Sequence, residues 1–188
     1  MVLAIATAFR TMLEFDLEDP ADIQAVDLSD RLNRINAMLC DITPEGMYAT
    51  GVAMLYDKRS RILQLHDYGH SLVWLKRKNK VYNLAENIVF DAADSVPFFG
   101  IDRNVRLNSK NFLLRPGDLL FVCSDGINEA KNPQKEELGV DRINQYLLQC
   151  EPEDGPEAAL RLRKEQWTLF RDGYRKLDDV SMLAAVIE

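Results

Sequence analysis

The segment at residues 115–126 reads RPGDLLFVCSDG. Its central residues, 119–123, are all apolar, and turn-forming residues lie on both sides of them. A short apolar run bounded by turns predicts a buried strand, here over residues 118–123. Asp125 follows this strand directly, where a fixed backbone can hold a carboxylate at the edge of a sheet. Asp125 is therefore a candidate functional residue.

A second acidic site stands at the start of another predicted strand. Asp178 and Asp179 directly precede the stretch 180–187, which reads VSMLAAVI. If the two strands are neighbours, the carboxylates converge on one point and need a cation between them. Oxygen ligands of this kind suit Mg²⁺ or Mn²⁺. Two such metals that share a bridging water can make it a nucleophile and neutralise a phosphoryl group as it is displaced.

A less specific interpretation explains both acidic sites as turns. Asp-Gly, at 125–126, is the commonest tight-turn dipeptide, and Asp-Asp, at 178–179, is an ordinary solvated turn. The spacing alone favours this interpretation. The residues at 127–131, INEAK, do not resume the alternation of a strand, which weakens the hairpin alternative without removing it.

Length and composition predict a single domain over residues 1–188. The chain is 47% hydrophobic and carries a net charge of −7, which argues against binding to nucleic acid or to an anionic membrane. No apolar run approaches the roughly 20 residues that cross a bilayer, and no secretory leader is recognisable. The three cysteines, Cys40, Cys123 and Cys150, form no metal-binding pair. We therefore expect reduced thiols and a cytoplasmic location.

The remaining periodicity places helices on both sides of a run of strands. Helical spacing of apolar residues covers 1–13, 20–39, 136–148 and a last stretch after the break at 151–156. Alternation predicts an antiparallel meander of strands at 48–56, 61–66, 71–75 and 80–84, then strands at 111–114 and 118–123 joined by the turn 115–117. This order predicts an α+β layered fold, not an alternating parallel one.

Seven short motifs together resemble one protein family. They are PGD at 116–118, SDGINEA at 124–130, LG at 138–139, DDVS at 178–181, YAT at 48–50, YGH at 68–70 and VPFFGI at 96–101. In their order along the chain, these motifs resemble the SpoIIE-like bacterial branch of the PPM-type (type 2C) metal-dependent serine/threonine protein phosphatases. The resemblance covers nearly the whole chain.

The resemblance implies a fold, a reaction and a cofactor. The fold is a four-layer αββα sandwich, in which two antiparallel sheets are flanked by helices. The reaction is metal-dependent hydrolysis of phosphoserine or phosphothreonine with two Mn²⁺ or Mg²⁺ ions. The substrate and partner is a phosphorylated regulatory protein, often an anti-sigma-factor antagonist in bacterial signalling.

The resemblance also assigns roles to particular residues. Asp125 and Asp178 correspond to metal-binding aspartates of the family, and Asp179 fills the polar position beside the second. Ser124 and Gly126 are expected to be structural residues near the site. His70 could act as a general acid, but after a glycine at a turn it is better interpreted as a structural hydrogen-bonding residue.

One departure from the family limits the expected activity. The family domain begins with an aspartate that bridges both metals, an adjacent glycine whose carbonyl binds one metal, and a Gly-His-Gly box, and none of these occurs in this sequence. The chain is therefore expected to be N-terminally truncated relative to the family, and inactive or weakly active alone. The alternative is a non-catalytic binding or regulatory module with a degenerate metal site.

Three further expectations concern the surface, the core and the assembly. The basic cluster at 76–80 is expected to be the solvated tip of a hairpin, and Cys123 a small core residue without reactivity. An unpaired sheet edge makes a dimer possible.

Overall fold

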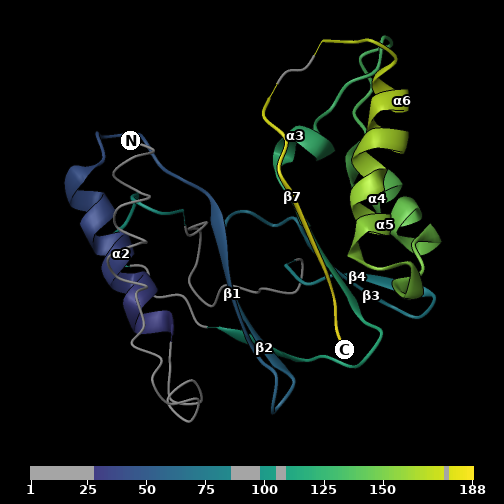
Figure 1. The fold of residues 1–188 in the computed structure, drawn as a ribbon. Coiled ribbons are helices and arrows are strands. Elements are labelled where there is room, and N and C mark those ends of the chain that lie inside the picture. The colour runs from purple at the N-terminus through teal and green to yellow at the C-terminus, as the bar shows by residue number, and fades with distance from the viewer. Residues whose placement is uncertain (1–27, 86–97, 105–108, 176–177) are drawn as a thin grey trace. The chain divides into compact units, whose positions relative to one another are not determined.

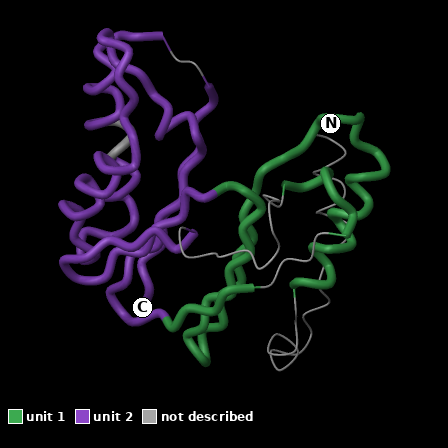
Figure 2. The backbone as a smooth tube through the Cα atoms, turned by 180° about the vertical axis from the view of Figure 1, so that it is seen from behind, with its two compact units in different colours: residues 1–70, 88–113 green, residues 71–87, 114–188 purple. Residues whose placement is uncertain are grey.

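The computed structural model describes residues 28–85, 98–104, 109–175 and 178–188. They belong to two compact units, one within residues 1–70 and 88–113 and the other within 71–87 and 114–188 (Figure 2). We call them unit 1 and unit 2. The helix predicted at 1–13 lies outside the described residues. The single domain over 1–188 stays a prediction.

Unit 1 has a three-stranded antiparallel sheet in the order β1-β2-β5. Its described elements are α2 (Leu28–Ile42), β1 (Gly51–Asp57), β2 (Ile62–Tyr68) and β5 (Lys110–Leu113) (Figure 1). Leu32, Ile35 and Leu39 of α2 are fully buried, and they share a core with Tyr68 and Phe99. The Tyr68 and Phe99 rings stack with their centroids 3.6 Å apart. The second predicted helix is therefore confirmed over its described part.

Unit 2 has a four-stranded antiparallel sheet in the order β4-β3-β6-β7. Its strands are β3 (Val73–Arg77), β4 (Lys80–Asn83), β6 (Leu119–Cys123) and β7 (Met182–Val186). Its helical elements are α3 (Asp125–Asn128), α4 (Gly139–Gln149), η2 (Pro152–Asp154), α5 (Pro156–Leu162), the π-helical turn η3 (Arg163–Trp167) and α6 (Thr168–Arg171). The predicted last helix is thus a continuous helical stretch from α5 to α6.

The core of unit 2 forms where the helices pack on the sheet. Trp74 and Phe121 face each other across β3 and β6, and both side chains are fully buried. Ile143 and Leu147 of α4, and Ala159 of α5, belong to the same buried cluster. All five residues of β6 are buried, as the apolar run predicted. This buried strand ends at Cys123, two residues before Asp125.

The predicted four-strand meander is wrong. β1 pairs with β2 and β3 pairs with β4, but β2 and β3 belong to different sheets. Gly69 and Ser71 between them both have positive φ angles, of 70° and 58°, so the backbone leaves the direction of β2 here. Alternation identified the strands, but it carries no information about which strands pair.

The strands at 111–114 and 118–123 also do not pair with each other. β5 pairs with β2 and β6 pairs with β3 and β7. The predicted turn between them is present, because the Asp118 N–H donates to the Arg115 carbonyl over 3.0 Å. Pro116 followed by Gly117 with φ of +83° matches a type II turn.

The basic hairpin tip is shorter than predicted, and Lys76 is not solvated. Lys76 lies on β3 and its side chain is only 2% exposed. Its Nζ donates to the carbonyls of Leu148, over 3.2 Å, and Cys150, and lies 3.8 Å from the Glu151 carboxylate. The last carbonyls of α4 carry partial negative charge, so a buried cation is stabilised there. These partners lie 72 or more residues further along the chain, so the local pattern around Lys76 could not predict them.

Candidate metal centre

Asp125 lies where β6 ends and the short helix α3 begins. Its side chain is exposed, whereas Gly126 and Ile127, which follow it, are buried. The hairpin form of the alternative interpretation is not observed, because the chain enters the helical turn α3 after β6. The carboxylate of Asp125 is therefore exposed directly beyond a buried strand.

Ser124 fastens the end of β6 to the segment before β7. Its N–H donates to the Ser181 carbonyl over 2.9 Å, and the Ser181 N–H donates to Ser124 Oγ over 2.9 Å. Ser124 Oγ in turn donates to the Asp179 carbonyl over 3.1 Å. These three hydrogen bonds continue the pairing of β6 and β7 beyond both strands. They bring the Asp125 and Asp178-Asp179 segments to the same edge of the sheet.

Gly126 allows the two segments to approach more closely than any side chain would. A Cβ atom at this position would lie 2.3 Å from the Asp179 carbonyl oxygen and 3.0 Å from its carbonyl carbon. Figure 1 shows α3 beside the chain that leads into β7. Glycine is therefore required by the close approach of the two backbones.

Asp178 and Asp179 are both exposed at this edge. Asp178 Oδ1 accepts a hydrogen bond from the Asp179 N–H over 2.6 Å, which fixes the orientation of that carboxylate. The Asp179 backbone carries the contacts to Ser124 and Gly126. The carboxylate of Asp178 is thus held in one orientation, whereas Asp179 contributes through the contacts of its backbone.

The thiol of Cys123 is withdrawn from this edge. Cys123 is 2% exposed, and burial, with a smaller contribution from the negative charge of Asp125, raises its pKa to about 12. A thiol with this pKa is protonated at neutral pH and is a poor nucleophile. The prediction of an unreactive core cysteine agrees with this burial.

His70, the remaining candidate, belongs to unit 1 and follows β2. Its backbone N–H donates to Asp67 Oδ1 over 2.7 Å. Its Nε2 atom is buried, and none of the described residues hydrogen bonds to it. Its role near the metal site stays a prediction.

The donor set at this edge suits a hard divalent cation. Two exposed carboxylates, Asp125 and Asp178, come from segments that are hydrogen-bonded to each other, and Mg²⁺ is commonly bound through one or two carboxylates and several waters. Within the described ranges, three or more His, Cys, Asp or Glu side chains do not gather at any one point as potential ligands. The described residues therefore do not form a cluster of three potential ligands at this edge.

A small hollow of about 60 Å³ lies beside Asp178. We call it the basic hollow. Its charged and aromatic lining consists of Glu129, Lys131, Trp167, Arg171, Arg175 and Asp178. Sequence reasoning missed it, because only Trp167 and Arg171, four residues apart, share one helical face, and the other lining residues come from separate segments.

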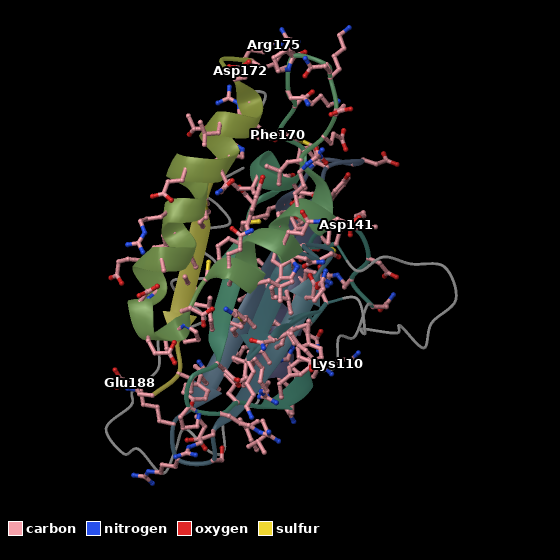
Figure 3. All side chains as sticks on the ribbon, turned by 90° about the vertical axis from the view of Figure 1, so that its right-hand side faces the viewer. Lys110, Asp141, Phe170, Asp172, Arg175 and Glu188 are labelled. Atoms are coloured by element: carbon pink, nitrogen blue, oxygen red, sulfur yellow. The ribbon has the colours of Figure 1, made fainter. Side chains whose placement is uncertain are left out.

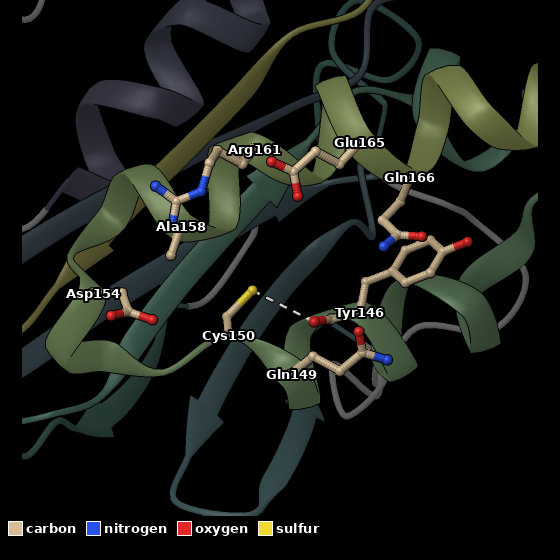
Figure 4. Close-up of a pocket in the computed structure, with 8 residues that line it drawn as sticks. All are labelled: Tyr146, Gln149, Cys150, Asp154, Ala158, Arg161, Glu165 and Gln166. Carbon is tan, nitrogen blue, oxygen red and sulfur yellow. Dashed lines mark hydrogen bonds between the residues drawn. The ribbon is translucent and has the colours of Figure 1, made fainter.

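A second, larger hollow of about 180 Å³ lies between α4 and the α5 to η3 stretch (Figure 4). Its lining includes Arg161 and Glu165, which Figure 4 shows on neighbouring turns above Cys150. The Cys150 thiol donates to the Tyr146 carbonyl over 3.4 Å, and burial raises its pKa. The candidate aspartates do not line this hollow.

Comparison with solved structures identifies the fold. The PP2C phosphatase domain with a fragment of the regulatory domain of SpoIIE from Bacillus subtilis matches with a TM-score of 0.73 at 20% identity, over 99% of this chain and 50% of that one. The SiaA PP2C domain of Pseudomonas aeruginosa gives 0.72 at 15% identity, over 99% and 67%. The catalytic domain of the serine/threonine phosphatase PstP, in complex with two manganese ions, gives 0.59 at 20%, over 99% and 80%. The predicted α+β fold of two antiparallel sheets flanked by helices is confirmed.

Sequence comparison identifies the family. No curated protein matched the sequence directly. No helix in the described part of the chain is both long and apolar enough to span a membrane. The family described as stage II sporulation protein E (SpoIIE) matches residues 1–188, which is the whole chain. The resemblance seen in the motifs is thus confirmed, and the chain belongs to the SpoIIE family of PP2C-type phosphatases.

Proposed function

We propose that this protein takes part in metal-dependent hydrolysis of phosphoserine or phosphothreonine in a cytoplasmic regulatory protein of the anti-sigma-factor-antagonist type. The observation that carries the proposal is the junction at Ser124. Three hydrogen bonds of this residue hold the segment of Asp125 against the segment of Asp178. Family membership supports the reaction class.

Asp125 and Asp178 would hold Mn²⁺ or Mg²⁺, with Asp179 as a weaker candidate ligand. When bound, the cation supplies a water of lowered pKa and neutralises charge on the phosphoryl group. The chain itself supplies position: Ser124 and Gly126 fix the distance between the two segments, and the Asp179 N–H orients the Asp178 carboxylate. Neither Ser124, whose hydroxyl is hydrogen-bonded twice, nor the buried Cys123 is placed as a nucleophile.

A second candidate is a non-catalytic binding or regulatory module. It is favoured by the fact that the described residues offer two converging segments of carboxylates but no group of three potential ligands. Such a module would keep a partner surface and bind metal weakly. For the enzyme, the same small number of ligands leads us to expect slow release of phosphate by this chain alone.

The test is phosphate release from a phosphoserine protein as a function of Mn²⁺ concentration. We expect release that depends on the metal, and a loss of at least about tenfold in the Asp125→Asn variant, because a ligand charge is removed. Asp141→Asn is the matched control, since Asp141 is an exposed aspartate in the first turn of α4.

Each outcome selects one candidate. Metal-dependent release that Asp125→Asn lowers at least about tenfold and Asp141→Asn leaves intact supports the enzyme. No metal-dependent release from the chain, together with weak Mn²⁺ binding that Asp125→Asn removes, supports the binding module. Release of equal rate in wild type and Asp125→Asn contradicts the assignment of Asp125.

A further inference from the structure

Basic side chains gather beside Asp178 in a protein whose net charge is −7. Lys131, Arg171 and Arg175 line the basic hollow together with Glu129 and Asp178. They come from three separate parts of unit 2: the chain after α3, the end of α6, and the segment before β7. A cation-rich wall built from three segments next to a carboxylate proposed to bind metal is suited to an anion.

Arg171 is held in a defined position. Its guanidinium carbon lies 4.4 Å from the centre of the Trp167 ring, within the range of a cation–π contact. Its Nη2 donates to the Tyr174 carbonyl. Because a guanidinium has five N–H donors, these contacts orient the group and still leave it donors for a ligand.

Trp167 connects Arg171 to the segment of Asp125. The indole is buried, with 6% exposure, and its Nε1 donates to the Gly126 carbonyl over 3.2 Å. Gly126 directly follows Asp125 and contacts the Asp179 backbone. One chain of contacts therefore fixes Arg171 relative to both acidic segments.

Arg175 and Lys131 complete the wall with more freedom. Arg175 is exposed, and Figure 3 shows it at one end of unit 2, opposite Glu188. Lys131 pairs with Glu137 over 3.3 Å, and its side chain is 35% exposed. Both are long, flexible basic side chains that can turn toward an anion.

The hollow is of the right size and charge for a phosphate group. A cavity of about 60 Å³ admits several water molecules, and so the oxygens of one phosphate. Arginine binds two phosphate oxygens through its planar fork. Asp178 and Glu129 also line the hollow, and their negative charges repel an anion. Binding of phosphate is therefore favoured when a cation neutralises Asp178.

We propose that Arg171, with Arg175 and Lys131, forms a phosphate-binding subsite that takes the phosphoryl group of the substrate beside the metal-binding carboxylates. The inference rests on the proposed function, which it extends by naming the residues that recognise the phosphate. The alternative is that Arg171 only covers Trp167 and stabilises the fold.

The experiment is a calorimetric titration of three ligands into the chain, with and without Mg²⁺. The ligands are inorganic phosphate, a phosphoserine peptide and the same peptide without phosphate. Arg171→Gln should weaken binding of both phosphate ligands at least about tenfold, Arg171→Lys less, and Arg175→Gln several-fold. Arg115→Gln is the matched control, because Arg115 is an exposed arginine at the other end of β6, and it should change nothing.

The outcomes separate the subsite from the function it rests on. If Arg171→Gln loses affinity for both phosphate ligands and binds Mg²⁺ as wild type does, the result supports the subsite. If Arg171→Gln loses affinity for inorganic phosphate alone, the result supports the subsite with free phosphate as its ligand. Wild-type affinity for phosphate in Arg171→Gln overturns the subsite, even where Asp125→Asn shows that the metal site exists. An equal loss of affinity of Arg171→Gln for the unphosphorylated peptide also overturns the subsite.

The Mg²⁺ titration of wild type tests the metal site separately from the phosphate subsite. If wild type binds no Mg²⁺, the proposed function fails, and the titrations without metal still decide whether Arg171 binds phosphate. Circular dichroism checks the fold of each variant. If Arg171→Gln unfolds, the exposed Arg175→Gln variant decides: unchanged phosphate affinity there overturns the proposal.

Discussion

The two ends of β6 carry aspartates in opposite environments. Asp118, before the strand, is 1% exposed, and Arg77 binds it with two hydrogen bonds of 2.8 and 2.6 Å. The Arg115 N–H donates a third, over 2.7 Å. Asp125, after the strand, is exposed, and none of the described basic side chains forms a salt bridge with it.

The difference separates a structural carboxylate from a candidate functional one. The protein neutralises Asp118 with its own arginine, and the pKa of Arg77 is raised by its hydrogen bond to Asp118. Asp125 and Asp178 face solvent at the same edge of the sheet, where an external cation could neutralise them. Changes at the first end should therefore affect stability, and changes at the second should affect binding.

The largest expected effect is at the buried end. Arg77→Ala leaves the Asp118 charge buried without its partner and should lower the free energy of unfolding by about 3 to 4 kcal/mol. Asp125→Asn should change it by no more than about 0.5 kcal/mol. Urea denaturation measures both. Equal destabilisation by the two variants would remove the distinction between the two ends.

Gly126→Ala should have the next largest effect. The new Cβ would lie 2.3 Å from the Asp179 carbonyl oxygen, so the segments must move apart, at about 2 to 3 kcal/mol. Gly51→Ala is the control, because its Cβ would meet only the Phe99 ring, at 3.3 Å. Urea denaturation should show a clearly smaller effect for the control, and similar values would argue against the close approach.

Ser124→Ala should cost less. It removes the two hydrogen bonds of the hydroxyl group but leaves the backbone pairing with Ser181, so we expect a loss of about 1 to 2 kcal/mol. Mn²⁺ affinity should fall several-fold, because the two acidic segments are no longer fastened. Ser60→Ala, at an exposed turn of unit 1, should leave Mn²⁺ binding unchanged. Unaltered Mn²⁺ affinity in Ser124→Ala would show that this junction does not position the site.

The smallest effect is the pH dependence due to Cys123. Its pKa is raised to about 12 in the folded protein, so the unfolded chain loses the proton first as pH rises. The folded protein then binds more protons than the unfolded one, and stability falls with rising pH, by about 1 kcal/mol or less between pH 8 and 9.5. Urea denaturation at both pH values should show this fall reduced in Cys123→Ala. An identical fall in both proteins would contradict the shift.

The sequence predicted elements better than their partners. The apolar run of β6 and the helical periodicity of 136–148 identified real elements because burial leaves a local pattern. The meander was wrong, and Arg77 and Lys76 were placed in a solvated tip, because pairing depends on residues far along the chain. Asp118, 41 residues from Arg77, could not be recognised as its partner by spacing.

The candidate site shows the same limit. Asp125 and Asp178 were predicted from their places at strand ends and from the family motifs. The hydrogen bonds of Ser124 and the contact between Trp167 and Gly126 depend on three-dimensional packing. Sequence could suggest which residues carry charge, but not which of those charges the protein neutralises itself.

The most direct test of the proposed metal site is calorimetric titration of Mn²⁺ into wild type, Asp125→Asn and Asp141→Asn. Removal of one of the two carboxylates should weaken binding at least about tenfold in Asp125→Asn, while Asp141→Asn binds as wild type does. Equal Mn²⁺ binding by all three proteins would contradict the assignment of Asp125 to a metal site.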